Sequence, residues 1–265
     1  MRCLDVISTH LFREVLFYNF LFKDPTMRGY VINLDRQPER LTHFYQQPGS
    51  EIFQKVSAVD RKVLDIIGNK EFFFDVATFT RMIPRGPTMG EIACTLSHIK
   101  CWQLIALDES IDEDEFCLIA EDDITLLPSN KNTPSKFLDV VSDISKALED
   151  TPVELVKLQM LSYRESNLFT GNGNISLSKS IATGFDASYD NTGSSLYLIR
   201  KSLTQTIMHK LKTKKPYWLA DGFTKFCNPE NIMMSLPLLG YVKGNLSSDL
   251  EEERFQQIQT HIQNT

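Results

Sequence analysis

Short apolar runs alternate with helical patterns from residue 29 onward, and this alternation restricts the chain to a small set of folds. Five runs have the pattern of strands: YVINL (30–34), FQKVSAV (53–59), FCLIA (116–120), VELVKLQM (153–160) and SSLYLIR (194–200). Helical patterns occupy ERLTHFYQQ (39–47) and KSLTQTIMHKL (201–211). The alternation predicts an α/β fold with a mainly parallel, Rossmann-like sheet and helices on both faces.

The strongest helix signal begins at Thr88. Thr88 and Glu91 have the spacing of a capping box, in which each side chain accepts the backbone N–H of the other residue. Apolar residues then recur on one face of the predicted helix, at Ile92, Leu96, Ile99 and Ala106.

Composition excludes several classes of protein. With 265 residues, 42% of them hydrophobic, the chain can form one large α/β domain. A net charge of −6 and the lack of a basic stripe argue against nucleic-acid binding. The five cysteines form no CxxC pair and none has a zinc-type spacing to a histidine, so we expect a reduced, cytoplasmic compartment.

The ends of the chain differ from its middle. We expect an N-terminal helical extension over residues 1–27, a catalytic domain over 28–250 and a polar helix or tail over 251–265. Polar residues interrupt the apolar stretch 6–22, which argues against a signal peptide or a membrane span. Packing on the domain and peripheral contact with the inner membrane are both left open for this segment.

Three consecutive carboxylates, Glu121, Asp122 and Asp123, follow the apolar run 116–120. Like charges about 4 Å apart repel by roughly 4 kcal/mol at an effective dielectric near 20, so a partly buried triplet needs a partner. The carboxyl end of a buried strand is where α/β sheets bind ligands. Hard ions such as Mg²⁺ or Mn²⁺ prefer oxygen ligands, so we expect a divalent metal here, with a plain acidic turn as the alternative.

Several motifs in sequence order resemble glycosyltransferase family 25, the lipopolysaccharide-biosynthesis glycosyltransferases related to collagen galactosyltransferases. They are VINLDRQPER (31–40), AVD (58–60), GEIACTLSHIKCW (90–102), LIAEDDITLLP (118–128), GSSLYLIRKSL (193–203) and LADGF (219–223). The resemblance spans roughly residues 28–250. It implies an A-type glycosyltransferase fold, a UDP-galactose or UDP-glucose donor and inversion at the anomeric carbon. Arg61 is a departure, because family members often carry glycine there.

The resemblance also implies a donor site, in which Asp123 and Glu121 bind the metal. The residues expected to contact the nucleotide sugar are Asn33, Arg36, Arg40, Asp60, Glu91, His98, Glu121 and Asp122. Four of them have a structural alternative: Arg40 as a salt-bridge partner, Asp60 as a turn residue, Glu91 as a cap and His98 as a core group. Glu91 and His98 lie about 10 Å apart on one helix, so they are not expected to bind one ion together.

An inverting transfer needs a base on the acceptor side. Asp221 is our candidate, with Asp186 and Asp190 as reserves, and Gly193 and Ser194 are expected to line the acceptor. We therefore expect a metal-dependent, inverting hexosyltransferase that acts on a lipooligosaccharide or other glycan acceptor. The alternatives are an inactive sugar-nucleotide binding module and, with less support, a phosphoryl-transfer enzyme, for which a phosphate-loop motif is lacking.

Overall fold

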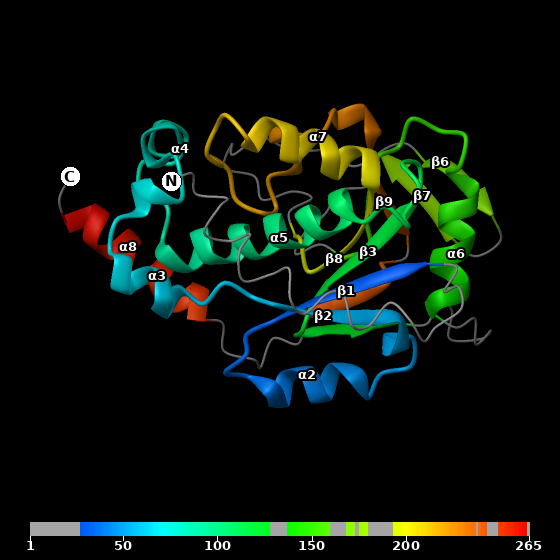
Figure 1. Cartoon of the computed structure of the whole chain (residues 1–265), viewed down its shortest axis with the longest axis horizontal. Helices are drawn as coiled ribbons and strands as arrows, with labels where there is room; N and C mark the ends of the chain where they lie inside the picture. The colour runs from blue at the N-terminus through cyan, green and yellow to red at the C-terminus, as the bar shows by residue number, and fades with distance from the viewer. Residues whose placement is uncertain are drawn as a thin grey trace.

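The computed structural model describes residues 27–127, 137–159, 168–172, 175–179, 193–236, 238–242 and 249–263. These residues form an α/β fold in which helices cover both faces of a central sheet (Figure 1). The predicted fold class is confirmed. The predicted N-terminal extension, apart from Met27, lies outside the described residues, as do Asp186 and Asp190.

Within the described residues, eight strands form one sheet in the order β2-β1-β3-β8-β5-β9-β7-β6. Their bounds are β1 Arg28–Asn33, β2 Phe53–Ser57, β3 Phe116–Glu121, β5 Leu155–Lys157, β6 Leu168–Asn172, β7 Ile175–Lys179, β8 Leu196–Arg200 and β9 Ile232–Leu236. β8 and β7 run opposite to the other six strands. The sheet is thus mainly parallel, as predicted, with β8 inserted antiparallel between β3 and β5.

The chain changes direction across the sheet at β1. It leaves β1 through α2 (Pro38–Tyr45) to reach β2 on one side, and later places β3 on the other side of β1. In open α/β sheets such a switch point opens a crevice at the carboxyl ends of the two strands. Asn33 ends β1 and Glu121 ends β3, so both lie at this crevice.

The long helix α5 (Met89–Leu107) begins with the predicted capping box. The Thr88 hydroxyl accepts the Glu91 N–H at 3.0 Å, and the Glu91 carboxylate accepts the Thr88 N–H at 2.9 Å. Most of α5 is buried, because it runs along the sheet with α7 (Lys201–Leu211) beside it (Figure 1). The capping box therefore starts a core helix whose first turns reach the crevice.

The two faces of the sheet are covered by different helices. Ile32 and Ile119 pack on one face with α5, α7, α3 (Arg61–Ile67) and α4 (Val76–Met82). Val31 and Leu118 pack on the other face with α2 and α6 (Phe137–Ala147). Because side chains alternate along a strand, Glu121 shares the α5 face with Ile119.

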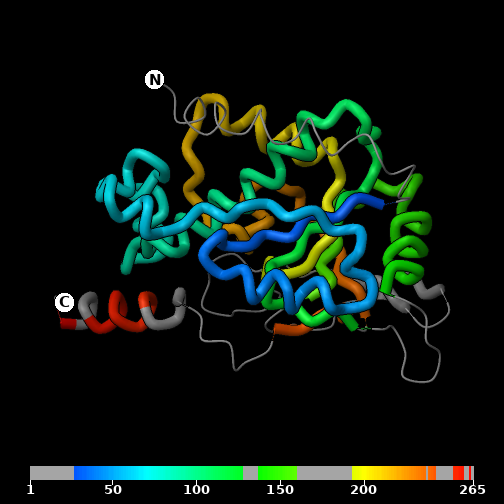
Figure 2. The backbone as a smooth tube through the Cα atoms, turned by 60° about the horizontal axis from the view of Figure 1, so that its bottom comes forward, coloured from blue at the N-terminus to red at the C-terminus, as the bar shows by residue number. Residues whose placement is uncertain are grey.

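The remaining elements are short. β4 (Ile124–Leu126) pairs with β10 (Gly240–Val242), and β6 and β7 form an antiparallel pair at the sheet edge. Four 3₁₀ turns are described: η2 Ser50–Ile52, η3 Lys70–Phe72, η4 Phe223–Lys225 and η5 Pro229–Asn231. The C-terminal helix α8 (Asp249–Gln263) lies at the same end of the molecule as α3 and α4 (Figure 1, Figure 2). In the part of the chain that the structure describes, no helix has the length and apolar character needed to cross a bilayer.

Candidate functional site

A pocket opens at the carboxyl ends of β1 and β3, beside the first turns of α5. Six of the predicted site residues line it: Arg36, Arg40, His98, Glu121, Asp122 and Asp123. Asn33, Asp60, Glu91 and Asp221 are not part of its lining, although Asn33 and Asp60 each contact a residue that is. The sheet and α5 thus bring together residues from three separate motifs.

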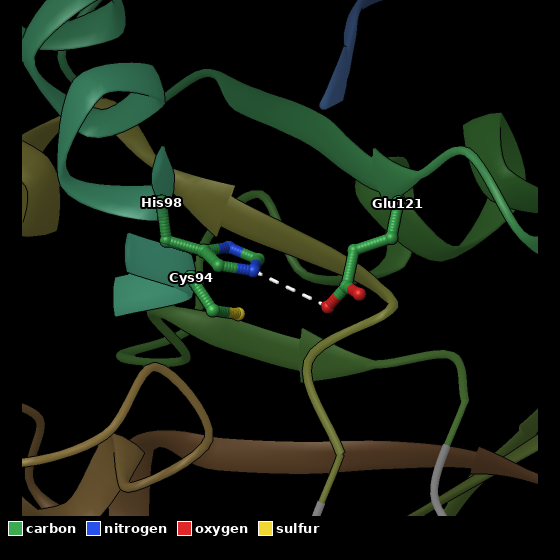
Figure 3. A group of neighbouring side chains, drawn as sticks. All are labelled: Cys94, His98 and Glu121. Atoms are coloured by element: carbon green, nitrogen blue, oxygen red, sulfur yellow. Dashed lines mark hydrogen bonds and ion pairs between the residues drawn. The ribbon is translucent and has the colours of Figure 1, made fainter. Parts of the chain in front are cut away.

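Glu121 is held by α5 and by the segment just before β8. His98 Nε2 lies 3.3 Å from Glu121 Oε1, and the Ser194 hydroxyl donates to the same oxygen at 3.3 Å. Figure 3 shows the His98 ring and the Cys94 thiol, both from α5, pointing toward the Glu121 carboxylate at the end of β3. Gly193, at φ 132°, occupies a backbone region that favours glycine and leads the chain into Ser194.

Buried aromatic groups set the orientation of His98. The Trp102 indole N–H donates to the Tyr197 oxygen at 2.9 Å, and that hydroxyl lies 2.9 Å from His98 Nδ1. Since the Tyr197 oxygen already accepts one proton, its own proton points to Nδ1, which places the proton of the neutral imidazole on Nε2. His98 therefore donates to Glu121. Burial raises the pKa of Glu121, but the hydrogen bonds from His98 and Ser194 and the charge of Arg40 oppose that effect, and the pKa lies below its ordinary value.

Asp122 points to α2 and is fully bonded. Asn33 Nδ2 donates to Asp122 Oδ2 at 2.6 Å, and the Arg40 guanidinium pairs with Asp122 Oδ1. Arg40 also pairs with Asp123 Oδ2 at 3.0 Å. Arg40 thus pairs with two of the three carboxylates, although burial still raises the pKa of Asp122 above its ordinary value. Its predicted contact with phosphate stays a prediction.

Asp123 is the least satisfied member of the triplet. Its Oδ1 is buried and has no hydrogen-bond partner. Burial raises the pKa of Asp123 to about 7, and the nearby Glu121 carboxylate adds to the shift. A buried carboxylate oxygen without a partner, close to a second carboxylate, has the donor chemistry of a site for a hard divalent cation. Glu121 and Asp123 thus fit the predicted metal.

Cys94, His98 and Glu121 form a second group whose ligand atoms lie within 4.8 Å of one another. The sequence interpretation missed it, although Cys94 and His98 are four residues apart and share a helix face. The hydrogen-bond directions do not favour a metal between these three, because the Nε2 proton of His98 points at Glu121. Burial also raises the pKa of the Cys94 thiol well above its ordinary value.

Arg36 and Asp60 form an ion pair at the rim of the pocket, with Arg36 Nε 2.8 Å from Asp60 Oδ2. Asp60 also caps α3, because its side chain accepts the Lys62 N–H at 3.0 Å. Burial raises the pKa of Asp60, but the hydrogen bond from the Lys62 N–H and the Arg36 guanidinium lower it by more. The pKa therefore lies below its ordinary value. Arg61, the residue that departs from the family pattern, lines the pocket and pairs with Glu253 of α8 at 3.1 Å.

Glu91 is occupied by structural contacts. Besides the capping box, its carboxylate accepts two hydrogen bonds from Arg85, at 2.6 and 2.8 Å, and one from Arg254 Nε at 2.7 Å. Burial raises its pKa, but Arg85 and the Thr88 N–H outweigh that effect and the pKa lies below its ordinary value. The side chain is only 1% exposed. The predicted contact with a nucleotide sugar stays a prediction, and these bonds do not support it.

Asp221 lies on the α5 side of the sheet, just before η4. Burial raises the pKa of its carboxyl, while the positive charges of Lys157 and Arg254 oppose the shift. The negative charge of Asp221 adds to the rise in the pKa of Cys94, and Cys94 lines the pocket. Asp221 is thus close enough to the pocket to affect a residue of its wall.

Several residues of the site were not predicted, and some left signals in the sequence. Trp102 follows His98 by four residues, so the two share a helix face. Lys157 is a charged residue inside the apolar run 153–160, which is unusual for a buried strand. Tyr197 and Arg254 left no local signal, because each acts on a partner far away in the chain.

The chain was compared with known proteins and with protein families. The comparison with curated proteins gave no match. The profile of glycosyltransferase family 25 (LPS biosynthesis protein) matches residues 27–221, which contain β1, β3, α5 and the acidic triplet. The mixed α/β architecture and the mainly parallel sheet are compatible with an A-type glycosyltransferase fold. The chain therefore belongs to glycosyltransferase family 25.

Proposed function

We propose that this glycosyltransferase moves a hexose, galactose or glucose, from a UDP-sugar to a lipooligosaccharide or another glycan acceptor, with inversion at the anomeric carbon. The observation that carries the proposal is the carboxylate pair of Glu121 and Asp123 in the pocket at the switch point, with one Asp123 oxygen buried and unpartnered. The family membership supports a sugar donor and a glycan acceptor in general terms.

Glu121 and Asp123 would hold Mn²⁺ or Mg²⁺. When bound, such an ion neutralises diphosphate charge and makes the nucleoside diphosphate a better leaving group. The chain prepares for it by orienting Glu121 through His98 and Ser194, and by holding Asp122 aside through Asn33 and Arg40.

The other residues of the pocket would bind the nucleotide and position the acceptor. Arg36 and Arg61 place guanidinium groups at the rim, where their planar N–H arrays suit phosphate oxygens. Asp60 holds Arg36 in place.

Asp221 would act as the base. It takes the proton of the acceptor hydroxyl while that oxygen forms a bond to the anomeric carbon, and the bond from the anomeric carbon to the diphosphate breaks on the opposite face. UDP leaves with the electron pair. A carboxylate whose pKa is raised by burial accepts a proton more readily than an exposed one.

A panel of nucleotide sugars tests the proposal. We expect one UDP-hexose to bind in the presence of Mn²⁺ or Mg²⁺ and to release free sugar slowly without an acceptor. Excess EDTA should abolish this release. Asp221→Asn should lower kcat for transfer at least a hundred-fold while donor affinity stays within a few-fold. Donor binding without release from any sugar nucleotide would instead support a binding module, and full turnover in EDTA would exclude the metal role.

Peripheral contact with the inner membrane from the cytoplasmic side is part of the same proposal, since a lipid-linked acceptor resides in a bilayer. The N-terminal extension, for which packing on the domain and membrane contact were both left open, lies outside the described residues apart from Met27. Flotation of the full chain with liposomes that carry the acceptor lipid tests it, with liposomes lacking that lipid as the control.

A further inference from the structure

The end of the molecule formed by α3, η3 and α8 exposes a large share of the apolar side chains at the surface. In the part of the chain that the structure describes, nine large hydrophobic residues are exposed, and six of them belong to these three elements. Single exposed apolar residues are ordinary, but a group of them at one place marks a contact surface. We call the group the apolar end, and its members are Val63, Ile66, Ile67, Phe72, Phe255 and Ile258.

α3 is apolar on the side that faces solvent. Leu64 packs into the core and is only 4% exposed. Val63, Ile66 and Ile67, spaced three and four residues apart on the helix, are 57%, 86% and 50% exposed. A helix at the surface normally turns polar residues outward. The outer side of α3 therefore has the character of a contact surface.

α8 is fixed beside the start of α3. The Glu253 carboxylate accepts the Gly90 N–H at 3.0 Å and pairs with Arg61, the first residue of α3, at 3.1 Å. Both views of the molecule place α8 at the end where α3 lies (Figure 1, Figure 2). Glu253 is the acidic residue of α8 with a described side chain, and these two bonds hold its carboxylate. Phe255 and Ile258 thus belong to the same end as the exposed side of α3.

The charge around the apolar end is positive. Residues 61–72 and 212–215 contain six basic and two acidic residues, although the whole chain has a net charge of −6. The two segments are adjacent, because Lys215 Nζ donates to the Glu71 carbonyl oxygen. Apolar side chains flanked by lysines suit an anionic bilayer, since the apolar groups enter the interface while the lysines attract lipid headgroups. Four of the basic residues are exposed: Lys62, Lys212, Lys214 and Lys215.

We propose that the apolar end docks on an anionic membrane surface and that this contact brings a lipid-linked acceptor to the pocket. The proposal deepens the proposed function and rests on it for the lipid-linked acceptor. Arg61 lines the pocket, and Ile66 lies five residues farther along α3, which is about 8 Å at the helical rise. A membrane that contacts Ile66 therefore lies near the rim of the pocket, where the glycan of a lipid can enter while its acyl chains stay in the bilayer.

Flotation of the full chain with vesicles tests the contact. Vesicles of phosphatidylglycerol and phosphatidylethanolamine should carry the wild-type protein, and vesicles of phosphatidylcholine alone should carry about ten-fold less, since anionic headgroups attract the lysines. The double variant Ile66→Asp with Phe72→Asp should bind the anionic vesicles about ten-fold more weakly. Leu107→Asp is a matched control, because Leu107 is 64% exposed and is the last residue of α5, whose first turns line the pocket. Its binding should not change.

Transfer assays separate this contact from the proposed function. With a water-soluble glycan acceptor, the double variant should keep kcat and KM, because neither Ile66 nor Phe72 lines the pocket. With the same glycan on a lipid in anionic vesicles, its rate should fall about ten-fold. If the wild-type protein transfers no sugar to either acceptor, the proposed function fails, and flotation still decides the membrane contact.

Three outcomes overturn the proposal. The first is a wild-type protein that does not float with anionic vesicles. The second is a double variant that floats as the wild type does, which would place the contact in another segment, such as residues 1–26. The third is a wild-type dimer in analytical ultracentrifugation that the two aspartates dissociate, because the apolar end would then be an interface between two copies of the chain.

Discussion

Glu91 is a buried carboxylate and Asp123 a half-buried one, and both pair with arginine, yet their hydrogen-bond partners and pKa shifts differ. Glu91 has Arg85, Arg254 and the Thr88 N–H as partners, and its pKa lies below its ordinary value. Among the described residues, Asp123 pairs with Arg40 alone and one of its oxygens has no hydrogen-bond partner, and its pKa is raised. A carboxylate with a complete set of partners stabilises the fold. A carboxylate at a pocket with an oxygen that lacks a partner can bind a ligand, such as a cation, through that oxygen.

The largest expected effect comes from removing the charge of Glu91, whose carboxylate is paired with Arg85 and Arg254. Glu91→Gln keeps the shape and an acceptor for the capping box but removes the charge between two arginines. We expect the free energy of unfolding at pH 7 to fall by about 3 to 5 kcal/mol, as for other broken buried pairs. Urea unfolding measures it. Glu253→Gln, the same change on a less buried carboxylate that pairs with Arg61, should cost no more than about 1 kcal/mol.

The pH dependence of that difference has a definite sign. Because the folded pKa of Glu91 is depressed, its contribution is present above the ordinary value of 4.5 and is lost as pH falls through the lower folded pKa. The gap in stability between wild type and Glu91→Gln should therefore narrow below pH 4.5. A gap that stays constant down to acid pH would show that the carboxylate charge is not what stabilises this end of α5.

The second-largest effect is expected at Asp123, the carboxylate with an oxygen that lacks a hydrogen-bond partner among the described residues. Asp123→Asn relieves repulsion with Glu121, so the free energy of unfolding should hold or rise slightly, while metal-dependent transfer falls at least a hundred-fold, or about 2.7 kcal/mol. Asp122→Asn is the matched neighbour. It removes the charge that Arg40 and Asn33 hold and should lower stability by about 1 to 3 kcal/mol. If Asp122→Asn and Asp123→Asn lost equal stability, the pairing of the two carboxylates would not explain their difference.

Metal binding tests the difference between Glu91 and Asp123 in an experiment that needs no substrate. At a metal concentration a hundred-fold above Kd, Mn²⁺ should stabilise the wild-type protein by about 2.7 kcal/mol, visible as a higher Tm. Asp123→Asn should lose most of this increase. Glu91→Gln should keep it, although from a lower starting Tm. If Mn²⁺ raises the Tm of Asp123→Asn as much as that of wild type, the metal lies elsewhere.

The smallest expected effect lies at the rim, where the ion pair of Arg36 and Asp60 is partly exposed. Arg36→Ala should weaken UDP binding about ten-fold, or 1.4 kcal/mol, while the free energy of unfolding changes by less than about 1 kcal/mol. Calorimetry measures the affinity. Arg81→Ala on α4 is the control, because Arg81 does not line the pocket and donates only within its own helix. Equal UDP affinities for the two variants would assign Arg36 to structure alone.

Much of the fold and part of the site could be predicted because they depend on local patterns. The apolar runs predicted β1, β2, β3, β5 and β8, and the spacing of Thr88 and Glu91 predicted the start of α5. The apolar run 116–120 placed the acidic triplet at the carboxyl end of a strand, where α/β sheets bind ligands. The strands β4, β9 and β10 were not predicted.

By itself, then, the sequence determined an α/β fold and the presence of three carboxylates at the carboxyl end of a buried strand. Only the tertiary structure decided which carboxylates are satisfied. Asn33 is 89 residues from Asp122, and Arg254 is 163 residues from Glu91, so no local pattern reveals these pairs. The physical reason is that the charge state of a buried carboxylate depends on its full set of neighbours in space, and that set exists only after distant segments have packed together.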